Sequence, residues 1–404
     1  MKIIKNLKTI IKNYFHPTAN VDDYTKWQYF KDTDKSNFEE ELIINYKRKA
    51  EDVKIFAYYL PQFHPIPEND SSFGKGFTEW TNVANASPLF VGHVQPKIPY
   101  DLGFYNLLQE GVIERQIELA KKHGVYGFCF YYYWFSGKRV LEKPIEKFMG
   151  IKTDFKFHIM WANENWAKLW DGGNKEVILK QEFCEQDFEA FFNDISNLVL
   201  DVKYEKKDGR PIIAIYRPSL FEKELFIKFT EFMNKKAKTI GLPGFYFVGT
   251  NATGFDKPYD YHLEGIIEFP PHGITDCPQK QVRWLNKKSS MLIFDLHKWL
   301  NAGYHRKACG YKIFKCCFPS WDNSPRKKYS GGWIFHMEKD DFYNWLTDNI
   351  KYTKINNREE AYLYINAWNE WAEGAMLEPS VQCGYKNLNT VQRAIIDSRD
   401  NVNE

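Results

Sequence analysis

Residues 361–374 read AYLYINAWNEWAEG. The first five of them are apolar and aromatic, which is the length and composition of a buried β-strand. Glu370 and Glu373 follow directly, with Trp368 and Trp371 around them. We therefore expect a strand that ends in two carboxylates and two indole rings at one edge of a sheet.

Runs of the same kind recur along the chain between helix-like segments. Strands are expected at 53–60, 126–134, 155–162, 211–216, 245–250, 265–269, 312–318 and 361–367. Helices are expected at 114–123, 188–200, 220–239 and 340–353, whereas the connection from the fifth strand to the sixth is only weakly helical. Eight strand–helix units over about 320 residues predict an α/β fold, a (β/α)8 TIM-type barrel.

The barrel does not account for the whole chain of 404 residues. We expect an N-terminal helical extension at 1–50, a (β/α)8 domain with the active site at 51–390 and a C-terminal tail at 391–404. The segments 61–101 and 270–293 are loops long enough to roof a site. The segment 318–332, with its Pro, Ser, Asn and paired Gly residues, is predicted to be another exposed loop.

Functional residues of such barrels come from the carboxyl ends of the strands. Polar and aromatic residues gather at these positions here, although strand ends are often polar in other folds, so only the whole pattern is informative. Apart from Glu370 and Glu373, the expected substrate-binding residues are His64, Glu79, Trp80, Tyr132, Tyr133, Trp134, Trp161, Asn163, Glu164, Trp166, Glu268, Trp321, Asn369 and Trp371.

Glu370 and Glu373 are the expected catalytic pair. On one helical turn their Cβ atoms would lie about 5–6 Å apart, and this proximity would raise one pKa and place an acid beside a base. Glycosidic-bond chemistry uses such pairs, about 5–5.5 Å apart in retaining enzymes and about 6.5–9.5 Å apart in inverting ones. The sequence leaves the distance open, and two solvated glutamates at a strand end are the simpler alternative.

Two further glutamates have competing interpretations. Glu164 lies between Trp161 and Trp166 and would either bind sugar hydroxyls or cap the next helix. Glu268 precedes Pro270-Pro271, where a structural role is favoured over sugar binding.

The composition limits the partners. The net charge of +3 gives no reason to expect nucleic acid, whereas the aromatic content of 17% suits a sugar-binding cleft as well as an aromatic core. The seven Cys form no CxxC pair, Cys316-Cys317 look like core residues, and such a scattered set indicates reduced thiols in a cytoplasm.

Residues 1–15 combine apolar residues at helical spacing with Lys2, Lys5, Lys8 and Lys12. Such a basic amphipathic helix would either contact a membrane surface or pack on its own domain. We therefore expect a cytoplasmic protein, located at the inner face of the membrane if residues 1–15 bind lipid.

No strong metal or cofactor motif is present. Asp32-Thr33-Asp34 matches a DxD pattern but lies in the polar extension, not after a buried strand. His64, His262 and His272 are too far apart in the chain to indicate a metal site, and no HExxH, GxGxxG or P-loop motif occurs. We expect neither a metal nor a cofactor.

Five motifs occur in order: YYLPQFHP at 58–65, GKGFTEWTNV at 74–83, GFCFYYYWF at 127–135, WANENW at 161–166 and WNEWAEG at 368–374. With them the chain resembles the WbsX-type family of bacterial surface-polysaccharide proteins, over roughly residues 53–385. That family is predicted to contain glycosyltransferases of O-antigen and related polysaccharide assembly. It is in turn similar to glycoside hydrolase family 99, the endo-α-mannosidases, which are (β/α)8 barrels.

The resemblance implies roles for the two carboxylates. Glu370 would remove the proton of a sugar 2-hydroxyl and so form a 1,2-anhydro sugar, with overall retention, and Glu373 would protonate the leaving oxygen and then activate the acceptor. This chemistry needs an axial 2-hydroxyl, as in mannose or rhamnose.

The expected function is therefore glycosyl transfer or transglycosylation in the biosynthesis of a cell-surface polysaccharide of the O-antigen or capsule type. The substrate would be an oligo- or polysaccharide, and whether it is lipid-linked stays open. A retaining endo-α-mannosidase-like hydrolase is the first alternative, and a non-catalytic glycan-binding protein is the second.

Overall fold

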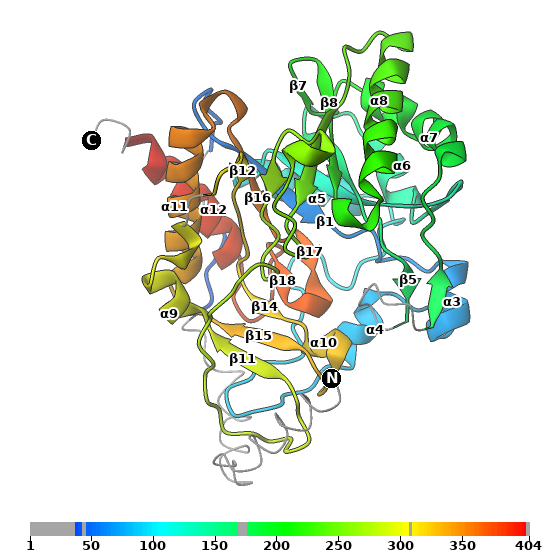
Figure 1. Ribbon diagram of the computed structural model, residues 1–404. Coiled ribbons are helices and arrows are strands. Elements are labelled where there is room, and N and C mark those ends of the chain that lie inside the picture. The colour runs from blue at the N-terminus through cyan, green and yellow to red at the C-terminus, as the bar shows by residue number, and fades with distance from the viewer. Residues whose placement is uncertain (1–36, 43–45, 169–175, 307–308, 401–404) are drawn as a thin grey trace.

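The structure is a computed structural model that describes residues 37–42, 46–168, 176–306 and 309–400 (Figure 1). The expected amphipathic segment 1–15 and the Asp32-Thr33-Asp34 motif lie outside these ranges, as does most of the expected N-terminal extension.

A ring of parallel strands forms the centre of the molecule (Figure 1). All eight expected strands are present, so the predicted (β/α)8 barrel is confirmed. They are β1 (Lys54–Tyr59), β2 (Gly127–Phe135), β4 (Lys156–Trp161), β8 (Arg210–Ile215), β9 (Tyr246–Thr250), β10 (Ile266–Ile267), the pair β12 (Ile313–Phe314) and β13 (Cys316–Cys317), and β16 (Tyr362–Ile365).

The seventh strand is split at Lys315, which separates β12 from β13. Its first half pairs with β10 and its second half with β16, while β16 pairs with β1. The segment 313–317 therefore joins the two ends of the sheet and closes the ring.

Alternation along the strands separates the barrel interior from the helical layer. In β1, Phe56 and Tyr58 point inward and pack with Tyr364 of β16, whereas Ile55 and Tyr59 belong to the outer core beneath the helices. Aromatic rings thus fill both sides of this strand, which explains part of the unusual aromatic content.

The helices that cover the barrel include all four that the sequence predicts, with small differences at their ends. The helices are α3 (Pro67–Phe73), α4 (Glu79–Ala84), α5 (Val112–Lys122), α6 (Lys143–Gly150), α7 (Phe188–Leu200), α8 (Lys223–Thr239), α9 (Leu296–Asn301), α10 (Ser324–Lys327), α11 (Asp341–Asn356) and α12 (Lys386–Asp400). Between β9 and β10 there is only one 3-10 turn, η3 (Tyr259–Tyr261), as the weak helical signal there indicated.

Short strands lie within the connecting loops. They are β3 (Lys138–Val140), β5 (Trp166–Ala167), β6 (Val177–Leu179), β7 (Lys206–Lys207), β11 (Leu292–Asp295), β14 (Trp321–Asp322), β15 (Trp333–His336), β17 (Asn369–Glu370) and β18 (Ala375–Met376). β11, β15 and β14 form a small separate sheet. The two long loops meet beside it, because Phe90 pairs with Trp284 and Leu89 packs against Trp284 and Ile293.

The segment 318–332 differs from the expected exposed loop. Trp321, Asp322 and Pro325 are buried, and only Lys328 to Ser330 are exposed. The prediction of an exposed loop is therefore wrong for the first half of this segment, which forms β14 and α10 and packs over the end of the barrel.

The C-terminal helix α12 crosses the expected boundary at residue 390 and packs against α11, where Tyr343 bonds to Asp397 at 2.7 Å. Residues 37–42 dock on its first turn, since Asn389 bonds to the Glu39 side chain and to Glu40 O. Within the described ranges, no helix is both long and apolar enough to cross a bilayer.

Candidate active site

Glu370 and Glu373 are presented by a tight turn after the last barrel strand. β17 pairs with β18, and the 3-10 turn η6 (Trp371–Glu373) joins them through Gly374. Gly374 has φ of 64°, and a Cβ there would lie 2.9 Å from Lys97 Nζ and 3.0 Å from the Asp322 backbone nitrogen. This position therefore needs glycine for its backbone angle and for space.

Arg326 of α10 joins the two carboxylates. Its Nη2 donates to Glu370 Oε2 and its Nη1 to Glu373 Oε1, both at 2.7 Å, and its Nε donates to Glu79 Oε2 at 3.2 Å. Since one guanidinium binds both Glu370 and Glu373 through neighbouring nitrogens, the two carboxylates lie close together. We call Arg326 with Glu79, Glu370 and Glu373 the carboxylate clamp.

The carboxylates of the clamp are buried to different depths. The Glu370 side chain is 5% exposed, while that of Glu373 is 21% exposed. Burial raises the pKa of Glu370 to about 8, an increase that Arg326 limits and that Glu373 and Glu79 reinforce. Glu370 thus holds a proton at neutral pH for much of the time, next to the more accessible Glu373.

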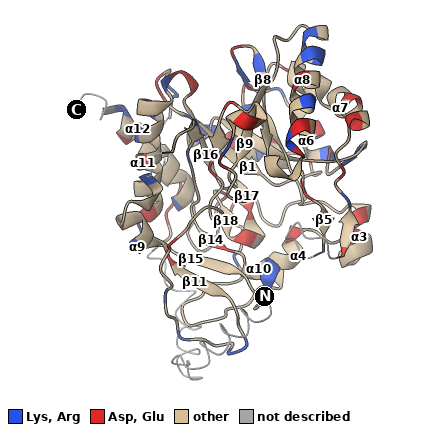
Figure 2. Ribbon diagram, viewed as in Figure 1, with Lys and Arg blue, Asp and Glu red and all other residues tan. Residues whose placement is uncertain are grey.

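Arg326 reaches this place because the start of its segment is tied to the loop after β1. Asp322 accepts hydrogen bonds from His93 at 2.8 Å and Gln95 at 2.5 Å, both in the loop after β1. Although burial opposes its ionisation, His93 and Lys97 hold the pKa of Asp322 well below its usual range. Figure 2 shows the basic residues of α10 next to the acidic turn η6.

A cavity of about 420 Å³ opens above the clamp at the carboxyl ends of the strands. Tyr131, Tyr133, Tyr216, Phe269 and Trp321 form much of its wall, and Glu370, Glu373 and Arg326 also line it. Carboxylates surrounded by aromatic faces at this end of a barrel are suited to acid–base chemistry on a polyhydroxylated ring.

A second ion pair lines the same cavity. Arg217 binds Glu164, and its backbone is fixed by Asn163, whose Oδ1 accepts from Arg217 N at 2.8 Å. His272 lies nearby, and burial, followed by the charge of Arg217, lowers its pKa to about 4. His272 is therefore neutral at physiological pH and can both donate and accept a hydrogen bond.

The structure brings some of the sequence-predicted residues together in this cavity and leaves the others elsewhere. Those that line it are Tyr133, Glu164, Trp166, Trp321, Glu370 and Glu373. Their contact with a substrate stays a prediction.

Several expected residues lie just behind the cavity wall. Glu79 takes part in the clamp, and Asn369 bonds to both Leu60 N and Leu60 O. Trp80 donates to Tyr105 O and packs against Trp371, which donates to Glu378 at 2.5 Å.

His64 is enclosed beside Pro61 O, and burial lowers its pKa to about 4. Glu268 binds Lys315 at 2.7 Å on the outer side of the strands, where Lys315 also donates to His305 O. The structure thus gives both residues structural partners.

Tyr132, Trp134 and Trp161 point away from the cavity into the helical layer. Tyr132 bonds to Asp194, Trp134 Nε1 donates to Asp187 at 2.7 Å, and Trp161 stacks on Phe191 with ring centroids 4.6 Å apart. Strand alternation explains this, because Tyr131 and Tyr133 on the same strand take the opposite, inward direction.

The cavity also contains residues that were not among the expected site residues. Tyr131 could have been found from the alternation of β2, and Arg217 from its place at the end of β8. Arg326 carried no comparable signal, because it lies in a segment with the composition of an exposed loop. Among the described residues, no group of three or more His, Cys, Asp or Glu side chains is placed to hold a metal ion.

The sequence model of the family described as glycosyltransferase WbsX matches residues 55–391. The chain belongs to the WbsX family. The family expected from the five motifs is thereby confirmed, and the match covers all the barrel strands except the first residue of β1.

Relatives of this WbsX-family chain include Uncharacterized protein WxcX of Xanthomonas campestris pv. campestris. The strain B100 protein is 35% identical over 354 residues, which cover 87% of this chain and 50% of the relative. The counterpart from strain ATCC 33913 is 34% identical over the same shares. The chain spans about half the length of the curated relatives it matches.

Solved structures similar to the WbsX-family barrel include a glycoside hydrolase-like protein with 13% identity and a TM-score of 0.55, covering 89% of this chain and 98% of the other. Another is the GH99 endo-α-mannosidase of Bacteroides thetaiotaomicron in complex with bis-tris-propane, with 14% identity, a TM-score of 0.51, and coverage of 86% and 97%. At such identities the likeness concerns the fold.

Proposed function

We propose that this WbsX-family protein is a carbohydrate-active enzyme that transfers a glycosyl group through Glu370 and Glu373, in the biosynthesis of a cell-surface polysaccharide of the O-antigen or capsule type. The observation that carries the proposal is the carboxylate clamp at the floor of an aromatic-walled cavity. A pair of carboxylates beside one reacting centre is what most glycosidases use to cleave a glycosidic bond.

The different burial of the two carboxylates supports a division of labour. Glu370, with a pKa of about 8, is a strong base once it is ionised. We assign it the removal of the proton from a sugar 2-hydroxyl, whose oxygen then attacks the anomeric carbon as the glycosidic bond breaks. The product of this step is a 1,2-anhydro sugar.

Glu373 is the more exposed member of the pair and can therefore reach a leaving group or an acceptor. We assign it the protonation of the leaving oxygen and, in the second step, the removal of the acceptor's proton. As the acceptor opens the anhydro ring at the anomeric carbon, the 2-oxygen recovers its proton from Glu370, and the configuration is retained overall. An axial 2-hydroxyl, as in mannose or rhamnose, suits this geometry.

The acceptor decides between transfer and hydrolysis. A sugar hydroxyl would give transfer, and water would give a retaining endo-hydrolase with the same two residues. The family match favours transfer, whereas the structural likeness to a GH99 endo-α-mannosidase keeps hydrolysis as the second candidate. A non-catalytic glycan-binding protein is the remaining alternative, and it predicts no turnover of any glycan substrate.

The test is incubation of the full chain with mannan- and rhamnan-type oligosaccharides, with and without activated sugar donors. Elongation that depends on a donor, or exchange between oligosaccharides, supports transfer. Release of reducing ends without a donor supports hydrolysis. The proposal fails if Glu370→Gln and Glu373→Gln turn over as fast as the control Glu189→Gln, a change on the exposed face of α7.

We also propose where the protein acts and what carries its substrate. A cytoplasmic enzyme at the inner face of the membrane would act on a lipid-linked glycan, with the basic segment 1–15 at the lipid surface. Deletion of residues 1–15 should then release the protein from anionic vesicles, and unchanged binding would contradict this placement.

A further inference from the structure

Glu378 lies behind the turn that presents Glu370 and Glu373. Its side chain is 1% exposed, and it does not line the cavity above the carboxylate clamp. The chain returns from the turn through β18, after which Leu377 N and Glu378 N donate to Trp368 O at 2.9 and 3.2 Å. Glu378 is therefore held beside the segment that carries the two carboxylates, on the side away from the cavity.

Glu378 accepts hydrogen bonds from three neutral side chains. Trp371 Nε1 and Tyr105 OH donate to its Oε2 at 2.5 and 2.9 Å, and Gln116 Nε2 donates to its Oε1 at 2.7 Å. Burial raises the pKa of Glu378 to about 7, whereas these hydrogen bonds favour its ionised form, which can only accept. The carboxylate thus connects η6, the loop before α5 and α5 itself at one buried point.

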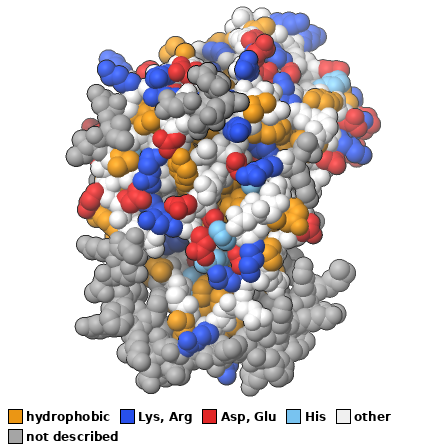
Figure 3. All heavy atoms as spheres, turned by 90° about the vertical axis from the view of Figure 1, so that its left-hand side faces the viewer, with side chains coloured by type: hydrophobic (Ala, Val, Ile, Leu, Met, Phe, Trp, Pro, Cys, Tyr) orange, Lys and Arg blue, Asp and Glu red, His pale blue; other side chains and the backbone are white. Residues whose placement is uncertain are grey.

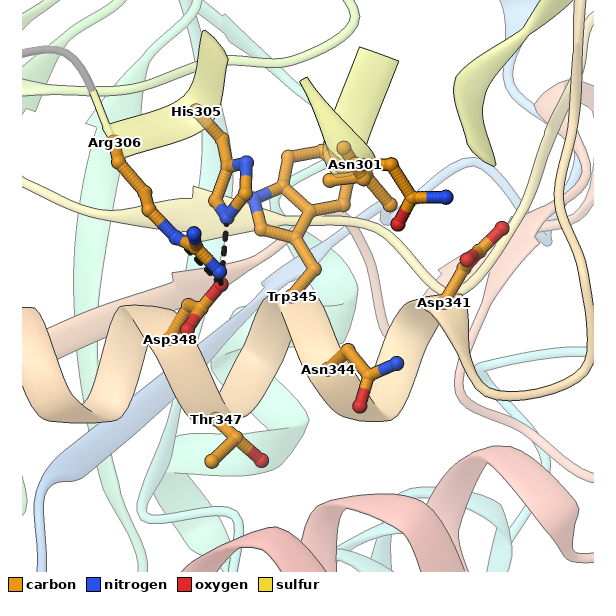
Figure 4. A pocket seen from close by; sticks show the side chains of 9 residues that line it. Asn301, His305, Arg306, Asp341, Asn344, Trp345, Thr347 and Asp348 are labelled. Carbon is orange, nitrogen blue, oxygen red and sulfur yellow. Dashed lines mark hydrogen bonds and ion pairs between the residues drawn. The ribbon is translucent and has the colours of Figure 1, made fainter. Parts of the chain in front are cut away.

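Asp348, on the outside of the barrel, has a cationic partner instead. Figure 4 shows Asp348 of α11 between His305 and Arg306, both of which it binds at 2.7 Å. Figure 3 likewise shows acidic and basic side chains next to one another on an outer face. Solvent weakens such surface ion pairs, whereas Glu378 makes directional hydrogen bonds in a buried place. Its contacts therefore fix the orientation of its neighbours.

These contacts reach the carboxylate clamp through Trp371. Trp371 follows Glu370 directly and begins η6, whose last residue is Glu373. Its ring packs against Trp80 with centroids 5.4 Å apart, and Trp80 follows Glu79, the third carboxylate of the clamp. Because the Trp371 side chain is 1% exposed and is held at its ring and at its nitrogen, the turn cannot shift without breaking one of these contacts.

We infer that Glu378 is a positioning residue, which holds Trp371 and thereby keeps Glu370 and Glu373 against Arg326. This role rests on the proposed chemistry of the two carboxylates. A displacement of about 1 Å at a reacting group can lower a rate by about 10²-fold. Because Glu378 does not line the cavity, its loss should affect the reaction rate more than the binding of the substrate.

The first experiment separates the hydrogen-bond acceptor from the charge. Glu378→Leu accepts no hydrogen bond, so kcat should fall by about 10²-fold while KM stays within about threefold of wild type. Glu378→Gln keeps an oxygen for Trp371 and Tyr105, because the Gln116 amide can turn to accept from the new amide group, and it should recover most of kcat. The matched control Glu205→Gln, which changes a buried carboxylate at the other end of the barrel, should keep most of kcat.

The second experiment asks whether Glu378 acts through Trp371. Trp371→Phe keeps a buried ring but has no N–H to donate, so it should lower kcat to a similar extent, and it tests the contact even where Glu378→Leu does not fold. The double variant should be no slower than the slower single variant, because both changes remove one interaction. Wild-type kcat in either single variant, or losses that multiply in the double variant, would overturn the inference.

Crystal structures of Glu378→Leu and Glu378→Gln test the role without any substrate. In Glu378→Leu we expect Glu370 to lose its 2.7 Å contact with Arg326 Nη2, and in Glu378→Gln we expect this contact to be kept. The inference is overturned if Glu378→Leu keeps the contact. Failure of the wild-type chain to turn over any glycan would instead contradict the proposed function, and the result from the crystal structures would still decide whether Glu378 positions the turn.

Discussion

Glu205 and Glu370 belong to opposite ends of the same barrel, and each is 4% exposed. Glu205, beneath the amino ends of the strands, accepts from Lys54 at 2.6 Å, Tyr362 at 2.9 Å and Tyr126 at 3.0 Å. Glu370 shares a single guanidinium with two other carboxylates. Two equally buried carboxylates thus have different surroundings, because Glu205 has three donors of its own and Glu370 shares one cation.

Variants of Glu370 and of Glu205 should differ most in their turnover rates. Glu370→Gln and Glu373→Gln should each lower the turnover rate by about 10²–10⁴-fold, because a positioned acid or base is lost. Glu205→Gln should keep most of the activity and instead lower the melting temperature, because Lys54 loses its buried anion. Rate assays and thermal unfolding on the same samples check this. An inactive but stable Glu205→Gln variant would contradict the assignment of Glu205 to stability and of Glu370 to activity.

Removal of Arg326, the cation that Glu370 shares, tests the contrast between the surroundings of Glu370 and those of Glu205. Arg326→Met should lower the rate by about 10²–10³-fold, the usual effect of losing one stabilising donor in an active site. Arg326→Lys should recover only part of the rate, since an ammonium cannot bind the carboxylates with the planar fork of arginine. Equal activity of the Lys variant and wild type would show that the fork has no role.

The pH profile should report the raised pKa of Glu370. If this residue is the base, kcat/KM should rise about tenfold per pH unit up to the pKa of about 8 and then level off. A fall above pH 8 would instead make Glu370 the acid and exchange the two proposed roles. Arg326→Met should move the rising limb to higher pH, because the cation that favours the carboxylate is gone.

The last prediction concerns stability. The pKa of Glu370 is raised from 4.5 to about 8 in the folded state, so the folded protein holds more protons than the unfolded chain in this window. This contribution to stability is full below pH 4.5 and is lost as the pH rises through about 8, by at most about 1.4 kcal/mol per unit. Chemical denaturation at several pH values should show Glu370→Gln gaining on wild type over this range, and parallel curves would contradict it.

Much of the fold could be predicted because strand periodicity and helix patterns are local. The eight strands were found from short apolar runs, even where only Ile266–Ile267 is a regular strand. The split of the seventh strand at Lys315 could not be found, because the contacts of Lys315 with Glu268 and with the backbone of His305 form only in the folded chain.

The site could be predicted only in part. Glu370 and Glu373 stand out because they follow a strand directly, but the direction of each aromatic side chain depends on strand alternation, which places Trp134 and Trp161 outside the barrel. Arg326 depends on contacts across the chain: Asp322 with His93 and Gln95, and its own contact with Glu79. No local pattern in the segment 318–332 indicates these partners.

The buried thiols of the barrel have a practical consequence. Cys129 of β2 and Cys316 of β13 face the interior, Cys317 faces the helices, and all of them are 0% exposed. Burial raises the pKa of these thiols, so an alkylating reagent can reach and modify them only when neighbouring strands separate. The rate at which Cys316 is alkylated, measured by mass spectrometry, therefore reports how often the ring opens at its split strand.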